Sequence, residues 1–334
     1  MAKFVDGSPV ASIFIGNPIV YQVSSAAIDS DKAAFHRVKM EVTVNGGDYE
    51  TKYELSQPIT GVASQTVEFD ISSCMRAHAD LYEYAPVTGE VSYPSFTASC
   101  SVKDVWVEDG QVRESQPETK SLSASMGRFS DYELRSGHGT LTATRSRKPA
   151  SGELVYPGDR IVYGTGSSSL SAGSSVVSVD ADAALYSSVS IPGIGQATVV
   201  PPDPRSRQFQ FVNSRGCVES IRAFGLPSEK IVSEKKEHTI SRFERINQFS
   251  RTMLRKFLRP AEMTFSSGYV SYEWAQWWAY EFCMGQQHWM LTPDGTWLPV
   301  LVSINDNATI IDRSKVGLCY IEFTVKPDAN GGLW

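Results

Sequence analysis

The sequence predicts a mainly β protein with two β-sandwich-like domains, an irregular middle region of short strands and linker, and one or two short helices. Apolar and polar residues alternate at both ends of the chain, which is the period of strands with one buried face. These stretches are separated by Gly, Pro and Asn at a density typical of β-sandwiches. At about 100–200 residues per domain, 334 residues predict two or three domains.

Residues 1–125 are predicted to form the first domain. Within residues 35–44 the apolar side chains occupy every second position, at Val38, Met40, Val42 and Val44. The segment Asn45-Gly-Gly-Asp48 tolerates positive φ and predicts a hairpin to a return strand over residues 49–55. Further strands are predicted over 65–71 and 95–107, with Ser72 and Ser73 capping a short helix from Cys74 to Leu81.

Residues 126–205 are predicted to form a small β subdomain with an excursion. The Gly/Ser-rich tract 164–175 has little to bury and is predicted to be a flexible loop. The stretches 176–179 and 197–200 are candidate edge strands that pair with each other. The segment Pro201-Pro-Asp-Pro204 predicts a stiff spacer and a domain boundary.

Residues 206–334 are predicted to form a C-terminal β domain that contains an aromatic-rich helix. Strands are predicted over 208–212, 296–304 and 317–325, and the last carries Cys319, Ile321, Phe323 and Val325 on one face. Ser271 is predicted to cap a helix that runs to Met284, with Gly285 just past its end. The apolar stripe of this helix consists of Trp274, Trp277, Trp278 and Phe282.

Charge and hydropathy exclude several classes of protein. Hydrophobic residues make up 41% of the chain and charged residues 20%, which supports folded cores and argues against disorder. A formal net charge of −6 argues against a general binder of nucleic acid or membrane surfaces, because such proteins need a basic excess. No apolar run approaches the ~20 residues that span a bilayer, so no membrane insertion is expected. The N-terminus lacks the residue order of a signal peptide, which predicts a chain that is not secreted.

The sequence contains no recognisable catalytic, cofactor-binding or metal-binding motif. The cysteines form no Cys-x-x-Cys pair and are predicted to be buried reduced thiols; they are Cys74, Cys100, Cys217, Cys283 and Cys319. The five histidines are scattered, and no nucleophile elbow, phosphate loop or dinucleotide fingerprint is present. We therefore predict no enzyme activity, no cofactor and no metal. A glycosidase or peptidase with two carboxylates remote in sequence stays open as an alternative.

Aromatic residues gather in the C-terminal domain at Trp274, Trp277, Trp278, Trp289 and Trp297. Three interpretations stay open: a core helix that fills the domain, an exposed face that binds a partner, or a platform that stacks on sugar rings.

A basic stretch in this acidic protein carries six cationic residues against the single acid Glu244; they are Arg242, Arg245, Arg251, Arg255, Lys256 and Arg259. Its apolar residues suit a helix face or curved strands. The stretch is either a solvated face beside a core stripe or a surface that docks electrostatically on an acidic subunit, with nucleic acid as a third partner class.

Both ends of the chain carry short distinctive motifs. In the N-terminal domain they are Gly16-Asn-Pro-Ile19 and Val67-Glu-Phe-Asp-Ile71. In the C-terminal domain they are Phe211-Val-Asn-Ser-Arg-Gly-Cys-Val-Glu-Ser220, Ser267-Gly268, the aromatic segment and the strand at Pro299-Val300. Through these motifs the chain resembles β-sandwich structural proteins in the tails or baseplates of phages and prophages that infect Bacteroidetes. The resemblance covers about two thirds of the chain and leaves the middle region aside. It implies a virion component that is assembled in the host cytoplasm and packs against copies of itself and other tail subunits.

The sequence thus predicts a structural component of a phage or phage-like tail or baseplate, which acts through subunit contacts. The alternative is an adhesin module that binds a host surface glycan or receptor through the Trp-rich segment.

Overall fold

The computed structural model is mainly β and contains several antiparallel sheets, which confirms the predicted class. The structure describes residues 1–11, 14–27, 35–60, 63–129, 145–166, 172–224, 228–230, 233–243, 248–258, 262–304 and 319–327. Two compact units divide the chain. Unit 1 comprises Met1–Arg147, Val162–Val176 and Val212–Glu219, and unit 2 comprises Lys148–Ile161, Val177–Phe211 and Ser220–Trp334.

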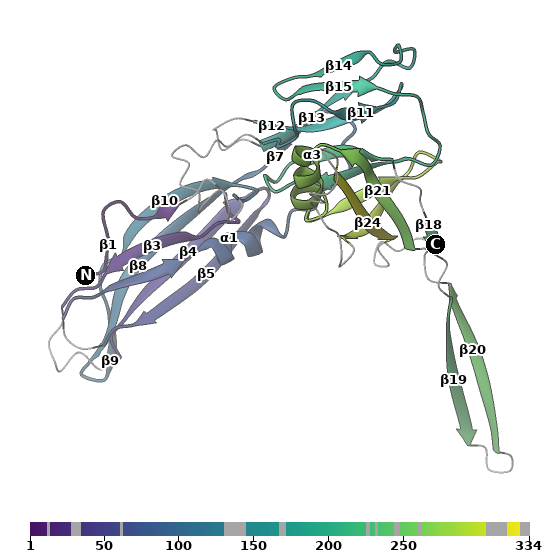
Figure 1. Cartoon of the computed structure of the whole chain (residues 1–334). Helices are drawn as coiled ribbons and strands as arrows, with labels where there is room; N and C mark the ends of the chain where they lie inside the picture. Colours follow the sequence, from purple (N-terminus) through teal and green to yellow (C-terminus); the bar gives the residue numbers. More distant parts are fainter. Residues whose placement is uncertain are drawn as a thin grey trace. The chain divides into compact units, whose positions relative to one another are not determined.

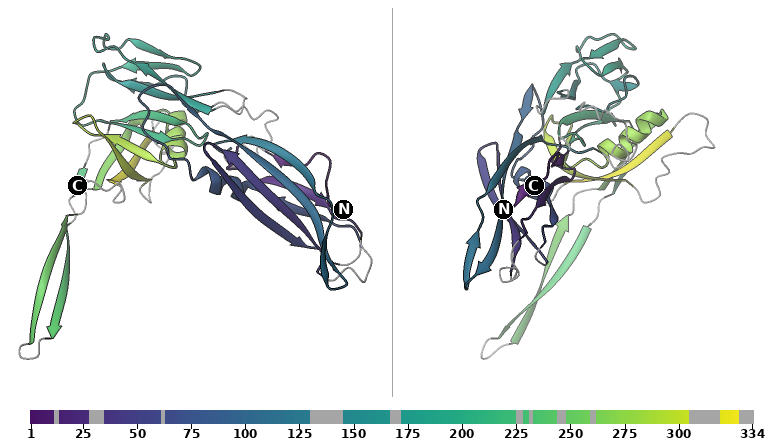
Figure 2. Two further views of the ribbon diagram at one scale, coloured as in Figure 1. Left: turned by 180° about the vertical axis from the view of Figure 1, so that it is seen from behind. Right: turned by 90° about the vertical axis from the view of Figure 1, so that its left-hand side faces the viewer.

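Unit 1 contains two antiparallel sheets that enclose its core. The first sheet is formed by β1 (Lys3–Phe4), β2 (Val10–Ala11), β3 (Ile19–Ser24) and β6 (Thr66–Asp70). The second is formed by β4 (Arg37–Gly46), β5 (Tyr49–Pro58), β8 (Ser95–Glu108), β9 (Gln111–Glu114) and β10 (Glu118–Ser125). In the second sheet β4 lies between β5 and β8 (Figures 1 and 2).

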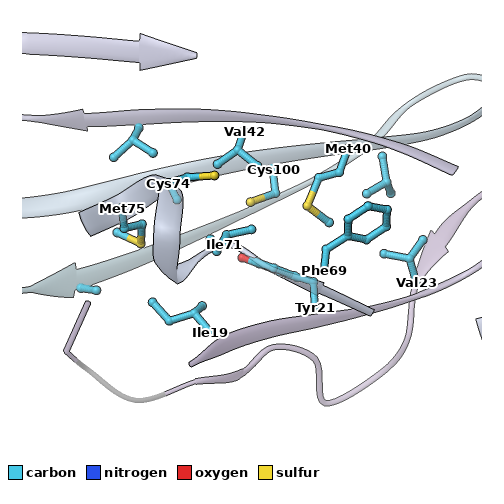
Figure 3. Close-up of a cluster of buried hydrophobic side chains, with 14 of the residues drawn as sticks. Ile19, Tyr21, Val23, Met40, Val42, Phe69, Ile71, Cys74, Met75 and Cys100 are labelled. Atoms are coloured by element: carbon cyan, nitrogen blue, oxygen red, sulfur yellow. The ribbon is translucent and has the colours of Figure 1, made fainter. Parts of the chain in front are cut away.

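The core of unit 1 lies between these sheets and includes helix α1 (Ser72–Ala79). In Figure 3, Met40, Val42 and Cys100 from the second sheet lie across the core from Tyr21 and Phe69 of the first. The predicted alternation in β4 is confirmed, because Val38, Met40, Val42 and Val44 are all fully buried.

The predicted hairpin is confirmed, since Gly46 pairs with Tyr49 and Gly47 has a φ of 61°. The predicted cap of α1 is wrong. Ser72 is already inside the helix, and the Oδ1 atom of Asp70 accepts a hydrogen bond from the backbone N–H of Ser72 at 2.9 Å.

The middle region forms more strands than predicted. A three-stranded sheet contains β7 (Val91–Tyr93), β12 (Arg160–Thr165) and β13 (Ala172–Ser178), and another contains β11 (Glu153–Val155), β14 (Ser188–Ile191) and β15 (Gly195–Val199).

Two expectations for the middle region are corrected. The loop prediction is wrong for residues 164–165 and 172–175 of the Gly/Ser-rich tract, which lie in β12 and β13, where ladder hydrogen bonds compensate for the small side chains. Residues 167–171 of the tract lie outside the described residues. The stretches 176–179 and 197–200 do not pair with each other, because β13 pairs with β7 and β12 while β15 pairs with β11 and β14. The predicted domain boundaries at 125 and 205 also differ from those of the two units, because the chain passes between them repeatedly.

Unit 2 is built on a seven-stranded sheet in the order β17-β16-β22-β23-β24-β21-β18. The strand bounds are β16 (Arg207–Val212), β17 (Val218–Ala223), β18 (Ser228–Lys230), β21 (Glu262–Val270), β22 (His288–Leu291), β23 (Trp297–Ile304) and β24 (Cys319–Pro327). The predicted face of the last strand is confirmed, since Cys319, Ile321, Phe323 and Val325 are all buried.

The predicted aromatic helix is present as α3 (Tyr272–Trp277), followed directly by the π-helical turn η1 (Trp278–Phe282). Ser271 caps it as predicted, and its side chain accepts a hydrogen bond from the backbone N–H of Trp274 at 3.3 Å. This helical segment packs against the seven-stranded sheet to form the core of unit 2. A helix therefore takes the place that a second sheet would occupy in a β-sandwich. No helix among the described residues is long and apolar enough to span a bilayer.

Candidate functional site

The basic stretch lies on a two-stranded antiparallel ribbon of β19 (Ser233–Phe243) and β20 (Gln248–Leu258), which we call the β19–β20 ribbon (Figure 1). Arg242 lies in β19, opposite Phe249. Arg251, Arg255 and Lys256 lie in β20. Arg245 and Arg259 fall outside the described residues, so four of the six predicted cationic positions are placed on the ribbon.

In the chain the ribbon lies between β18 and β21, two neighbouring strands at the edge of the large sheet of unit 2. The edge strand β18 pairs with β21, and the closing pair is Lys230 with Glu262. The chain then runs from β18 into β19 and returns from β20 into β21. The ribbon itself is a separate two-stranded sheet with eleven residue pairs.

No third strand pairs with β19 or β20 in the part of the chain that the structure describes. Each strand therefore has one edge whose backbone N–H and C=O groups have no partner strand, and such edges are templates for pairing with another chain. A two-stranded hairpin alone in water is marginally stable at best. In the described part of the chain the ribbon therefore leaves one open edge on each of its strands.

The positions along the ribbon combine apolar and cationic residues. Successive residues of a strand alternate between faces, so Phe249, Arg251, Met253, Arg255 and Phe257 occupy positions on one face of β20. Aromatic residues, Met and Arg are the types enriched in the buried centres of protein interfaces.

The tryptophans belong mainly to the core of unit 2. Trp274, Trp277, Trp278 and Trp289 are between 2% and 6% exposed, and Trp297 is partly buried. This burial confirms the core interpretation of the aromatic helix. It contradicts the exposed platform on which the glycan alternative depended.

Contacts around the helix explain why these side chains are buried. The indole Nε1–H of Trp274 donates a hydrogen bond to the carbonyl oxygen of Ser151 at 2.6 Å. The ring of Trp278 lies 4.9 Å from that of Phe282 and 5.7 Å from that of Phe323, centroid to centroid. Aromatic pairs at such distances stabilise a core beyond the area that they bury.

Two exposed tyrosines were missed by the sequence analysis. Tyr269 and Tyr320 face each other across β21 and β24 with ring centroids 5.8 Å apart, and they are 72% and 45% exposed. The register of this pair shifts between Ser266 and Tyr269, where Gly268 has a φ of 69°. The alternation of buried and exposed residues in the last strand predicts the outward position of Tyr320. The bulge that positions Tyr269 is visible only in the structure.

An open hollow with a volume of about 490 Å³ lies beside this tyrosine pair within unit 2. Its lining includes Ser151, Leu154, Arg222, Tyr269 and Trp274. Arg222 forms an ion pair with Asp159 and lies 4.1 Å above the ring of Tyr156. The positive charge of Arg222 is therefore neutralised by Asp159 within the protein.

Other titratable groups in the described part of the chain include a buried ion pair and several buried thiols. Lys148 and Glu153 form a buried ion pair at 2.6 Å. Burial raises the pKa of the Cys100, Cys217 and Cys283 thiols to about 12, which keeps them protonated. All five cysteines are free and buried, as predicted. Among the described residues, no group of three His, Cys, Asp or Glu side chains is placed to hold a metal ion.

No model of a protein family matches this chain, and neither a curated protein nor a solved structure shows significant similarity to it.

Proposed function

We propose that this protein is a structural component of a phage or phage-like tail or baseplate and that it acts through contacts between subunits. The observation that carries the proposal is the β19–β20 ribbon, whose two strands pair only with each other among the described residues. The resemblance of both ends of the chain to phage tail proteins supports a tail or baseplate as the assembly.

The energetics of the ribbon favour a role in assembly. Ordering a residue costs about 1–2 kcal/mol of backbone conformational entropy, and an isolated ribbon buries little apolar surface to compensate. A partner that covers one face or pairs with one edge supplies the missing burial and hydrogen bonds.

A shortened variant tests the role of the ribbon. Replacing residues 231–261 by Asn-Gly joins β18 to β21 through a two-residue turn next to the pair Lys230–Glu262. We expect the full chain to self-associate in sedimentation velocity and the shortened chain to remain monomeric with unchanged thermal unfolding. We also expect mass spectrometry to find the chain in purified particles. A monomeric full chain that is absent from particles would contradict the proposal.

A second candidate function is glycan binding at the Tyr269–Tyr320 pair and the adjoining hollow, since exposed tyrosine rings stack on sugars. Binding of the chain to a glycan array should then be lost in Tyr269→Ala. Tyr186→Ala is the matched control, because Tyr186 is equally exposed (73%) elsewhere in unit 2. Equal binding by both variants would exclude this site.

A further inference from the structure

The β19–β20 ribbon carries a concentrated band of positive charge. Its register places Lys235 opposite Lys256 and Lys236 opposite Arg255. These two pairs are consecutive, so one occupies each face of the ribbon. We call these four residues the cationic belt.

Like charges directly opposite each other destabilise an antiparallel pair. The cationic belt therefore weakens the isolated ribbon, although the same residues would strengthen it against a surface of opposite charge. This is the arrangement expected of an element whose partner is acidic.

The rest of the chain has the complementary charge. Residues 233–258 contain seven basic and three acidic residues, a formal charge of +4, within a chain of net charge −6. The other residues therefore carry −10. Unit 1 carries twenty acidic and fourteen basic residues, a formal charge of −6, and is the more acidic of the two units.

We infer that the cationic belt of the β19–β20 ribbon binds the acidic unit 1 of a second copy of this chain. The inference rests on the proposed function, in which many copies meet at high local concentration. The contact is heterologous, because a ribbon on one copy meets a different surface on the next. Heterologous contacts build rings or open filaments rather than two-fold dimers.

The apolar positions of the ribbon favour a protein over a nucleic acid as the partner. Phe249, Met253 and Phe257 alternate with Arg251 and Arg255 along β20. A phosphate backbone is recognised mainly through charge and hydrogen bonds, whereas a protein surface offers carboxylates and apolar contact together. Glu234 and Glu237, which flank the belt in β19, would be repelled by phosphates.

Charge reversal of the belt tests the inference. The variant combines Lys235→Glu, Lys236→Glu, Arg255→Glu and Lys256→Glu, and it keeps like charges opposite each other, so the repulsion within the ribbon is preserved. The control reverses two exposed basic residues of unit 2 outside the ribbon, Arg205→Glu and Lys326→Glu, and so leaves unit 1 unchanged. Thermal unfolding of each variant verifies that both units are folded.

Sedimentation velocity should show self-association of the unmodified chain that weakens at least about tenfold in belt-reversed protein and in high salt. The control should associate like the unmodified chain. The shortened variant keeps unit 1 but lacks the ribbon. When it is mixed with the unmodified chain, it should bind the end of each assembly and reduce the average size of the assemblies. Self-association that survives belt reversal would overturn the inference and leave the proposed function standing.

A fluorescently labelled DNA duplex of mixed sequence separates the two partner classes. Fluorescence anisotropy should show no binding that depends on the belt. Duplex binding that is lost on belt reversal, with self-association unchanged, would overturn the inference in favour of nucleic acid. A chain that is found in particles but stays monomeric in solution would also overturn it, since the partner would then be another subunit.

Discussion

Some buried titratable side chains of this protein are held in their neutral form by burial. His288 is the clearest case, because it is buried between the rings of Phe211 and Phe282 and its Nε2–H donates a hydrogen bond to the carbonyl oxygen of Phe282 at 2.6 Å. Burial lowers the pKa of His288 from 6.5 to about 4, and the hydrogen bond opposes this shift only in part.

The lowered pKa of His288 predicts acid sensitivity of unit 2. Below pH 6.5 the unfolded chain binds a proton at this residue, whereas the folded chain binds it only near pH 4. The free energy of unfolding should therefore fall by about 2–3 kcal/mol between pH 7 and pH 4.5 because of this group.

The variant His288→Gln keeps a donor for the Phe282 carbonyl and removes the titration. We expect its unfolding free energy to fall less over this pH range, as measured by urea unfolding monitored by tryptophan fluorescence. All tryptophans except Trp106 belong to unit 2, so the signal follows that unit. Parallel pH dependences in the variant and the unmodified chain would refute this assignment.

At the scale of elements, tight turns hold neighbouring segments of unit 1 in contact. Gly216 ends the Asn213–Gly216 turn with a φ of 73°, and its N–H donates to the carbonyl oxygen of Asn213 at 3.0 Å. A Cβ atom at this position would lie 2.4 Å from the Cβ atom of Met126. The buried Arg145 binds the carbonyl oxygens of Met126 and Arg215 on either side of this approach, at 3.1 and 3.2 Å.

Gly216→Ala should therefore destabilise unit 1 by about 2–4 kcal/mol, through a positive φ and a steric clash together. Gly110→Ala is the matched control, since Gly110 has a φ of 72° and nothing within 4 Å of its added Cβ. The control should cost about 1–2 kcal/mol from φ alone. Urea unfolding followed by circular dichroism measures the free energy of unfolding of both variants. An equal loss of stability in the two variants would contradict the prediction, because the contact with Met126 would then add no destabilisation.

At the scale of the whole molecule, the chain does not divide into units in sequence order. Residues 162–176 and 212–219 belong to unit 1, although residues that precede each of them in the chain belong to unit 2. These returning segments are held in unit 1 by hydrogen bonds to tyrosine side chains. The hydroxyl of Tyr93 contacts the hydroxyl of Ser174 at 2.9 Å, and the hydroxyl of Tyr84 donates to the carbonyl oxygen of Gly216 at 2.9 Å.

A fragment of residues 1–147 should consequently fail to fold like unit 1 in the full chain. It contains both sheets of the sandwich but lacks the partners of the Tyr84 and Tyr93 hydroxyls and one of the carbonyl oxygens that Arg145 binds. We expect a broad thermal transition with a lower midpoint by circular dichroism. A cooperative transition at the midpoint of unit 1 in the full chain would show that the returning segments are dispensable.

The elements of the chain were largely predictable from local patterns. The alternation at Val38–Val44, the turn at Asn45–Asp48 and the cap at Ser271 were confirmed, because each depends on neighbours within a few residues. The two ends of the Gly/Ser-rich tract, residues 164–165 and 172–175, were wrongly predicted to be loop for the opposite reason. The tract's own residues favour a loop, and only hydrogen bonding to strands remote in sequence makes most of its described part β.

The sequence by itself determined the mainly β class, the buried thiols and the net charge, since these follow from composition and short-range periodicity. Only the tertiary structure decided that the tryptophans form a core, that Tyr269 and Tyr320 meet on the surface, and that Lys235 and Lys236 lie opposite Lys256 and Arg255. The physical reason is that burial and cross-strand pairing are properties of residues far apart in the chain. Their identity is written in the sequence, but their proximity arises only when the strands are aligned in register.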